Sequence, residues 1–334
     1  MHFSSIYLFS FIILNFVPTI LSFGPLSSHF VEWLKSNHYD HYDFSRLDYG
    51  INGSFGGKID EHDQIERTPI IFFHGNSDAA LTTNPPMLNG FVEHLTYYTN
   101  KGYKLSELYS TSWQDNDMKK AAIRTHDCET IQRLRAFMNA VLGYTQALKI
   151  SVVSHSMGVT LARKVIKGGR IEEGTTEKTC DIGPSLADRV EVHVAISGGN
   201  QGLCTCHGLS ESNQYPTCNS KNGFWAGDRC NENTDCKQYP LEEDCTQRDY
   251  SLYLKDLNNG EPEGEFVFSL WSKADELVKA GCWSWGQPTC LVPGSHGKMI
   301  YDGLSHIETR DLTPIDVYSI LTEKRIPIKV KHEL

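Results

Sequence analysis

The feature that most constrains the fold is a strand that runs without a break into a tight turn and then a helix. Residues 148–153 read Leu-Lys-Ile-Ser-Val-Val, a mostly apolar run typical of a strand buried in a parallel sheet. Residues 154–158, Ser-His-Ser-Met-Gly, follow directly, and residues 159–166 form a helical stretch that Gly168 and Gly169 stop. This order predicts a parallel sheet joined by crossover helices.

The same alternation of strand and helix continues along the chain. Residues 118–144 have apolar residues at three- and four-residue spacing and predict one amphipathic helix that ends near Gly143. We therefore expect an α/β fold, with a mostly parallel central sheet, helices on both faces and one cysteine-rich insertion. Reactive groups in such sheets gather beyond the carboxyl ends of the strands. Further strands are expected at residues 68–73, 103–113, 189–196, 265–271 and 298–301.

Residues 200–264 interrupt this alternation with a polar, turn-rich segment that holds six of the ten cysteines. It has too few apolar residues to bury a core of its own, and disulfides are the usual substitute in so small a segment. We interpret it as an insertion in a single domain that spans residues 23–334. The rival is a zinc site at Cys204, Cys206 and His207, but Cys-x-Cys is closer than the usual zinc-ligand spacing. Disulfides are favoured, and their pairing stays open.

The two ends of the chain resemble targeting signals. Residues 6–21 are almost wholly apolar yet short for a bilayer-spanning helix, and they predict a signal peptide at residues 1–22. An uncleaved anchor and a buried core helix are the alternatives. The last four residues, Lys331-His-Glu-Leu334, resemble a retrieval signal of the endoplasmic reticulum. With the cysteines, these ends predict a secreted protein, or alternatively one of the endoplasmic reticulum lumen, and the glycosylation sequon at Asn52 fits both.

The charge of the chain excludes one class of partner. The formal net charge is −10, and no run of lysines and arginines occurs. Nucleic acids and anionic membrane surfaces are bound through clustered cations. We therefore expect neither as a partner held by electrostatic attraction.

Ser156 is the candidate nucleophile. A serine hydroxyl reacts poorly until a base removes its proton, and a sharp strand-to-helix turn exposes the side chain while aiming helix amides at the site. Ser-His-Ser-Met-Gly matches the nucleophile elbow Gly-x-Ser-x-Gly, with Ser154 in place of the first glycine. The alternative is an ordinary serine that caps the helix that follows.

His74-Gly75-Asn76 follows an earlier predicted strand, where enzymes with this elbow place half of an oxyanion hole. We assign the backbone N–H groups of Asn76 and Met157, the residue after the nucleophile, to the stabilisation of the oxyanion. The alternative is a polar loop with an incidental His-Gly pair.

Asp275 and His306 are the candidate acid and base. Asp275 follows the strand at residues 265–271, with Glu276 as its nearest competitor, and the alternative role is to cap the turn that follows. His306 lies in Gly303-Leu-Ser-His-Ile, after the last predicted strand, and His296 is its substitute candidate. The chain order serine, aspartate, histidine is the one expected of this fold.

Four segments together resemble the class 2 lipase family, which groups small Bacillus-type lipases with secreted nematode lipase-like proteins. The resemblance covers about residues 65–310 and implies an α/β-hydrolase fold, no organic cofactor, and hydrolysis of acylglycerols or related esters. The cysteine-rich insertion departs from the compact bacterial lipases, which affects substrate range more than chemistry. The segments are residues 69–76, Ser-His-Ser-Met-Gly at 154–158, Ala-Ile-Ser-Gly-Gly at 195–199, and Gly-Leu-Ser-His at 303–306.

We therefore expect a serine hydrolase that cleaves carboxylic esters, a triacylglycerol lipase-like enzyme of lipid catabolism. The alternatives are an esterase for small soluble esters and an inactive relative that binds lipid or protein. We expect a lipid or small ester as partner, transient contact with a lipid interface, no stable protein partner, and neither a metal ion nor an organic cofactor. Residues 200–264, with Phe224 and Trp225 as apolar contacts, are expected to cover the acyl pocket; a disulfide-bonded loop without that role is the alternative.

Overall fold

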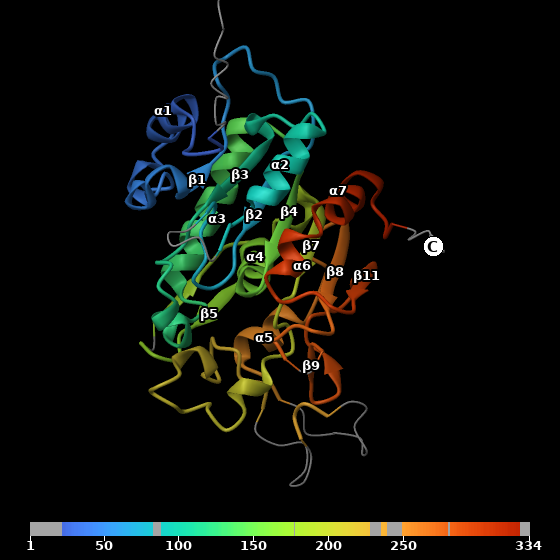
Figure 1. Ribbon diagram of the computed structural model, residues 1–334. Coiled ribbons are helices and arrows are strands. Elements are labelled where there is room, and N and C mark those ends of the chain that lie inside the picture. The colour runs from blue at the N-terminus through green and yellow to red at the C-terminus, as the bar shows by residue number, and fades with distance from the viewer. Residues whose placement is uncertain are drawn as a thin grey trace, which may run out of the picture.

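The computed structural model describes residues 22–82, 88–176, 178–227, 235–238, 249–279 and 281–327. Their main feature is a seven-stranded sheet in the order β1-β3-β2-β4-β7-β8-β11 (Figure 1). Every neighbouring pair is parallel except β1 and β3. The strands are β1 (Ser54–Phe55), β2 (Ile70–Phe73), β3 (Leu108–Thr111), β4 (Ile150–His155), β7 (Val190–Ile196), β8 (Phe266–Ser272) and β11 (Gly297–Tyr301).

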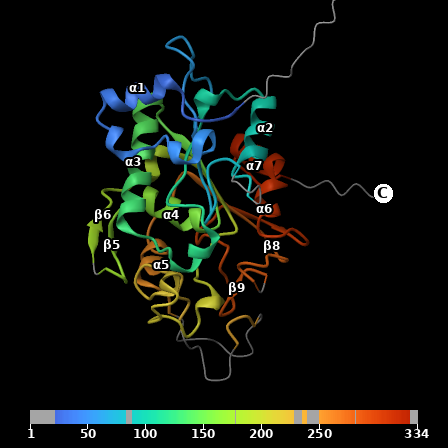
Figure 2. The ribbon, with the colours of Figure 1, turned by 60° about the vertical axis from the view of Figure 1, so that its left-hand side comes forward.

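Helices cover both faces of this sheet, as Figures 1 and 2 show. Along β2 the side chains alternate between two cores: Ile71 and Phe73 pack with α1, α3 and α4, whereas Ile70 and Phe72 pack with α2 and α7. Burial on both faces explains why the central strands are apolar throughout. The predicted fold is confirmed. The helices are α1 (Ser28–Ser36), α2 (Val92–Asn100), α3 (Cys128–Thr145), α4 (Met157–Lys167), α5 (Leu252–Leu257), α6 (Glu308–Asp311) and α7 (Pro314–Glu323).

The prediction of one helix over residues 118–144 is wrong. A short 3-10 helix, Met118–Ile123, ends at Arg124, which is extended, and α3 begins only at Cys128. Asp127 caps α3 by accepting a hydrogen bond from the amide of Thr130 (2.8 Å). The helix also runs past the expected end at residue 143 to Thr145. Similarly, only residues 108–111 of the strand expected at 103–113 form β3, and a 3-10 turn at residues 105–107 precedes them.

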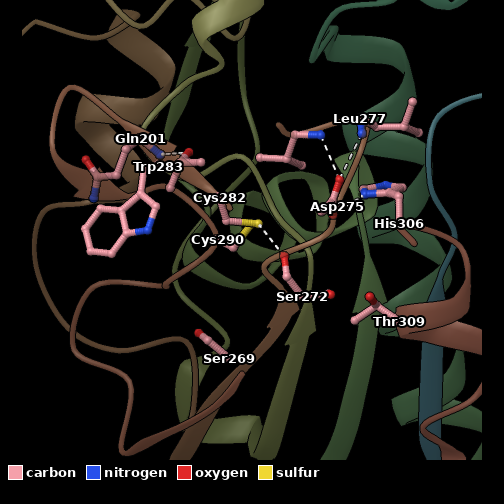
Figure 3. Close-up of a disulfide and its surroundings, with 12 residues drawn as sticks. Gln201, Ser269, Ser272, Asp275, Leu277, Cys282, Trp283, Cys290, His306 and Thr309 are labelled. Carbon is pink, nitrogen blue, oxygen red and sulfur yellow. Dashed lines mark hydrogen bonds and ion pairs between the residues drawn. A yellow bond between two sulfur atoms is a disulfide. The ribbon is translucent and has the colours of Figure 1, made fainter. Parts of the chain in front are cut away.

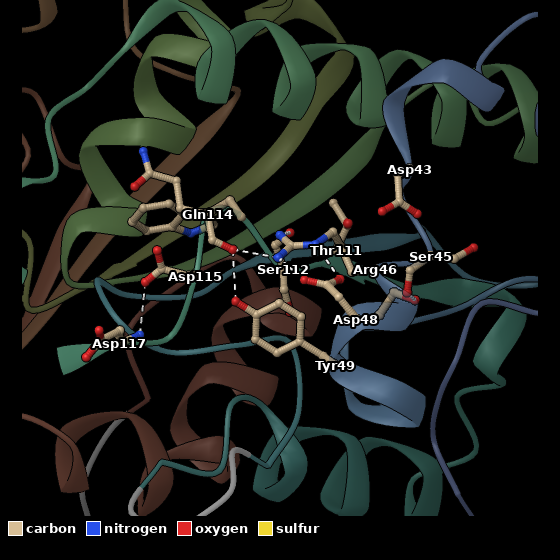
Figure 4. Close-up of polar contacts among 12 residues, drawn as sticks. Asp43, Ser45, Arg46, Asp48, Tyr49, Thr111, Ser112, Gln114, Asp115 and Asp117 are labelled. Atoms are coloured by element: carbon tan, nitrogen blue, oxygen red, sulfur yellow. Dashed lines mark hydrogen bonds and ion pairs between the residues drawn. The ribbon is translucent and has the colours of Figure 1, made fainter. Parts of the chain in front are cut away.

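The loop after β3 is held by contacts from the N-terminal region (Figure 4). The Arg46 guanidinium donates to the carbonyl oxygens of Ser112 (2.8 Å) and Gln114 (2.7 Å), and it pairs with Asp48 (2.7 Å). The Tyr49 hydroxyl donates to the same Gln114 oxygen (2.8 Å). This loop leads to the 3-10 helix at 118–123.

The described cysteines form four disulfides, which confirms the choice of disulfides over zinc. The sulfur atoms of Cys204 and Cys206, the candidate zinc ligands, are bonded to other cysteines. Cys230 and Cys245 lie outside the described residues. The insertion carries α5 and lies at the lower end of the molecule in Figure 1, in yellow and orange. The pairs are Cys128–Cys180, Cys204–Cys236, Cys206–Cys218 and Cys282–Cys290.

Both predicted targeting signals fall almost wholly outside the described residues, which begin at residue 22 and end at 327. Within the described part of the chain, no helix is both long and apolar enough to cross a bilayer. The signal peptide and the retrieval signal therefore stay predictions.

Candidate active site

Ser156 lies at the tight turn between β4 and α4. Its backbone has φ 57° and ψ −130°, a strained conformation for a residue with a side chain. Gly158 makes the turn possible, because a Cβ atom there would overlap the carbonyl oxygens of Phe73 and His74. At the position where the elbow pattern has its first glycine, the buried Ser154 hydroxyl bonds His193 Nε2 (2.8 Å). The strand-to-helix elbow that the sequence predicts is therefore present.

Ser156 and His306 line the same cavity, which has a volume of about 480 Å³. Its wall is mostly apolar, so it suits the hydrocarbon part of a substrate. Phe224 lines the cavity, whereas Trp225, the other residue expected to cover it, is not among the lining residues. Other apolar side chains of the wall are Met118, Leu203, Leu277, Val278 and Ile307.

The structure brings Asp275 and His306 together, as Figure 3 shows. Asp275 Oδ2 lies 2.7 Å from His306 Nδ1, and the two side chains are 0% and 2% exposed. Asp275 Oδ1 accepts hydrogen bonds from the amides of Leu277 (3.0 Å) and Val278 (2.8 Å). Asp275 thus both caps the turn and orients the histidine, so the two roles considered for it are compatible.

Asp275 is held in its charged form. Burial by itself raises the pKa of this carboxyl, but the hydrogen bond and charge of His306 and the amides of Val278 and Leu277 outweigh it. The net effect holds the pKa of Asp275 below its ordinary value. When the imidazole of His306 is neutral, an ionised carboxylate beside Nδ1 favours the tautomer that carries its hydrogen on Nδ1 and has an acceptor at Nε2.

His306 Nε2 is buried and has no hydrogen-bond partner among the described residues. No hydrogen bond joins it to Ser156 Oγ, although both residues line the cavity. In enzymes without substrate, hydrogen bonds between nucleophile and base are often long and form fully only in the complex.

The alternative candidates for acid and base, Glu276 and His296, make other contacts. Glu276 Oε2 accepts a hydrogen bond from the backbone amide of His306 (2.8 Å). His296 bonds Val267 through its amide (2.8 Å) and through Nδ1 (3.1 Å). Val267 lies near the amino end of β8, and Asp275 follows the carboxyl end of that strand. His296 is therefore separated from the acid by the length of the strand.

The loop after β2 packs against the nucleophile. A Cβ on Gly75 would lie 2.9 Å from Ser156 Cβ, so the approach requires glycine. Asn76 Oδ1 accepts a hydrogen bond from Arg124 (2.7 Å), and Asn76 Nδ2 donates to the Ala121 carbonyl (2.9 Å). Asn76 and Met157 both line the cavity. Their assignment as oxyanion donors stays a prediction.

Two residues that the sequence did not single out support this site. Arg124 is buried and also bonds Ser77, Asp115 and the Asp117 carbonyl (2.9 Å), which ties the loop of Asn76 to the region before α3. His155 lies against His306, with ring centroids 4.7 Å apart. The position of His155 within the Ser-His-Ser-Met-Gly pentapeptide was the one sequence feature that could have singled it out. No sequence pattern singled out Arg124, whose partners Asn76 and Ser77 lie 48 and 47 residues away.

No group of three or more His, Cys, Asp or Glu residues within the described ranges is placed to hold a metal ion. The expectation that the site needs neither metal nor organic cofactor stays a prediction.

Comparison with known proteins identifies the family. The family described as Lipase (class 2) matches residues 67–319. A comparison with curated proteins found no significant match. Among solved structures, Aspergillus fumigatus lipase B is 13% identical with a TM-score of 0.47, and the match covers 80% of this chain and 55% of that chain. This chain thus spans about half the length of that lipase.

Two further structures are similarly distant. Bacillus licheniformis lipase BlEst2 in mature form is 12% identical, with 80% of this chain and 97% of that chain covered and a TM-score of 0.47. A truncated carbohydrate esterase from gut microbiota is 15% identical, with 85% and 93% covered and a TM-score of 0.47. The family assignment rests on the sequence match, which covers more than half of the chain. This protein belongs to the class 2 lipase family.

Proposed function

We propose that this class 2 lipase hydrolyses carboxylic esters with Ser156 as nucleophile, His306 as base and Asp275 as acid. One observation carries the proposal: the buried Asp275–His306 pair leaves Nε2 free beside a cavity that also contains the strained Ser156. Family membership supports a lipase or esterase activity. An inactive binding protein would have no use for this pair.

The reaction follows from these positions. His306 Nε2 takes the hydroxyl proton as Ser156 Oγ attacks the ester carbonyl carbon, and it returns that proton to the alcohol oxygen when the ester C–O bond breaks. Water then attacks the acyl-enzyme, His306 takes the proton of the water, and the carboxylic acid leaves as Ser156 regains its hydrogen. Asp275 stays ionised throughout and stabilises the imidazolium.

The negative charge of each tetrahedral intermediate develops on the former carbonyl oxygen. The N–H of Met157 lies in the first turn of α4, where amides have no partner within the helix. With the N–H of Asn76 it supplies two donors for that oxygen. The hydrogen bonds of Asn76 to Ala121 and Arg124 hold its peptide beside the elbow.

The apolar wall of the cavity supports a substrate with a hydrocarbon acyl chain. On this basis we propose a triacylglycerol lipase-like activity in lipid catabolism. Met118 and Leu277 line the cavity and are 57% and 52% exposed, so the mouth offers apolar contacts to a lipid interface. A cavity of about 480 Å³ is also the size of a site for one small ligand, which favours an esterase for small soluble esters as the second candidate.

The four disulfides fit a secreted protein, because disulfides persist in oxidising compartments. We propose secretion as the destination, with the endoplasmic reticulum lumen as the alternative. Immunodetection of the full-length protein in the medium and in cell fractions distinguishes the two.

A kinetic comparison tests the proposed activity. Wild-type protein and Ser156→Ala are assayed with p-nitrophenyl esters of increasing chain length and with emulsified and dissolved glycerides. We expect hydrolysis by the wild type that rises with chain length and with the presence of an interface, and none by Ser156→Ala with an unchanged circular dichroism spectrum. Equal hydrolysis by both proteins refutes the assignment of Ser156, and a preference for short soluble esters identifies the esterase.

A further inference from the structure

The peptide groups of His306 are bonded to side chains rather than to a helix or strand. His306 lies in the loop between β11 and α6. Its backbone N–H donates to Glu276 Oε2 (2.8 Å), and its backbone carbonyl lies 3.1 Å from His155 Nε2. Because a carbonyl oxygen accepts only, His155 Nε2 carries the hydrogen and donates it. Hydrogen bonds from side chains therefore fix both the backbone N–H and the backbone carbonyl of His306.

The two holding residues are the chain neighbours of the other two members of the proposed triad. Glu276 follows Asp275, and His155 precedes Ser156. We propose that His155 and Glu276 are positioning residues, which fix the backbone of His306 so that its ring meets both Asp275 and Ser156. This inference rests on the proposed function, because it assigns a task to the base of that site. Reactive groups need placement to about 0.5 Å, which a free loop does not provide.

His155 is suited to this task because it stays neutral. Burial first, and then the nearby His306, Arg310 and His94, lower the pKa of His155 well below its ordinary value. Its ring lies against that of His306 with centroids 4.7 Å apart. A second positive charge at this distance would oppose the imidazolium that forms on His306 during the reaction. A neutral donor holds the carbonyl without that cost.

Glu276 acts from the surface. Its side chain belongs to an exposed residue, yet its carboxylate accepts the His306 amide at 2.8 Å. A hydrogen bond from an amide to a carboxylate is charge-assisted. Water competes with it at an exposed position, so we expect Glu276 to contribute less than the buried His155.

Paired variants separate positioning from packing. His155→Leu removes the donor, and His155→Gln keeps an N–H at similar reach; Glu276→Ala removes the acceptor, and Glu276→Gln keeps a carbonyl oxygen. A misplacement of about 1 Å costs on the order of 100-fold in rate, so we expect kcat to fall about 10- to 100-fold in His155→Leu and less in Glu276→Ala, with KM little changed. The two glutamine variants are expected to restore most of kcat.

His94→Leu is the matched control. His94 is also buried, and its Nε2 lies 3.0 Å from a backbone carbonyl, but that carbonyl belongs to Arg310. We expect it to lose stability as His155→Leu does and to keep kcat, measured per folded molecule. In a His306→Ala background, His155→Leu is expected to have no further effect on the residual rate, because the residue acts through the base.

A second readout does not depend on activity. NMR can detect the proton between His306 Nδ1 and Asp275 as a downfield resonance. We expect this resonance in wild type and His155→Gln, and we expect it shifted or lost in His155→Leu. An unchanged resonance together with an unchanged kcat in His155→Leu overturns the proposal, as does a further loss of rate in the His306→Ala background. If wild type shows the resonance and its response to His155→Leu but Ser156→Ala still hydrolyses esters, the proposed function fails while the positioning of His306 stands.

Discussion

The stability of this protein depends on pH through its buried histidines: His155, described above, and four more. Each is completely enclosed, and burial lowers the pKa of His74 and His94 to about 3 and that of His126 and His193 to about 4. In the unfolded chain their ordinary value is 6.5. Below pH 6.5 the unfolded chain therefore binds protons at these histidines, whereas the folded chain does not. Their contribution to the free energy of unfolding is fully present above pH 6.5 and is lost as the pH falls toward the pKa of the folded state.

The size of the effect follows from these values. At pH 5 an unfolded histidine is almost fully protonated and a folded one almost not, which lowers the free energy of unfolding by about 2 kcal/mol for each histidine. Four such groups together remove roughly 8 kcal/mol, comparable with the whole stability of a typical domain. We therefore expect the chain to be much less stable at pH 5 than at pH 7, at 25 °C with its disulfides intact.

Denaturant titrations followed by circular dichroism at pH 8, 7, 6 and 5 measure this dependence. Replacement of one group, His126→Gln, is expected to reduce the slope of stability against pH by about 1.4 kcal/mol per unit below pH 6, since one fewer proton is taken up on unfolding. Equal stability at pH 7 and pH 5, or a slope that His126→Gln leaves unchanged, refutes the reasoning.

Three further predictions concern the site and its support. Asp275→Asn, which leaves the histidine without a charged partner, is expected to lower kcat about 10³- to 10⁴-fold, measured on protein that circular dichroism shows to be folded; a loss below tenfold contradicts the role of the carboxylate. Gly158→Ala forces a Cβ onto the carbonyl oxygen of His74, so we expect a markedly lower yield of folded protein by size-exclusion chromatography, and a wild-type yield argues against the tight elbow. Arg310→Met leaves Asp78 buried without its ion-pair partner and is expected to cost about 3–5 kcal/mol in urea unfolding, most of which Asp78→Asn recovers in the double variant if the unpaired charge is the cause.

The elbow could be predicted because it is local. Strand, turn and helix occupy consecutive residues. The glycine at position 158 indicates that the start of α4 lies close to the end of β2. Asp275 and His306 could be proposed as a pair because the carboxyl ends of parallel strands meet at one edge of the sheet. The two residues follow β8 and β11, which are neighbours in the sheet, and their side chains lie 2.7 Å apart.

The contacts that were not predicted join distant segments. Arg124 lies in the break between the two helices, and its side chain bonds Asn76, 48 residues away. The hydrogen bond from His155 to the carbonyl of His306 joins residues that are 151 positions apart, and no periodic pattern in the sequence predicts it. The disulfide pairing of the insertion depends in the same way on how its turns fold, so spacing alone left it open.

Covalent labelling tests the central claim most directly. The wild-type protein is treated with a fluorophosphonate probe, and the modified peptide is mapped by mass spectrometry. We expect one adduct, on Ser156, whose formation slows at least about 100-fold in His306→Ala, because the unassisted hydroxyl is a poor nucleophile. An adduct on another serine, or labelling of Ser156 at the same rate without the imidazole of His306, contradicts the account.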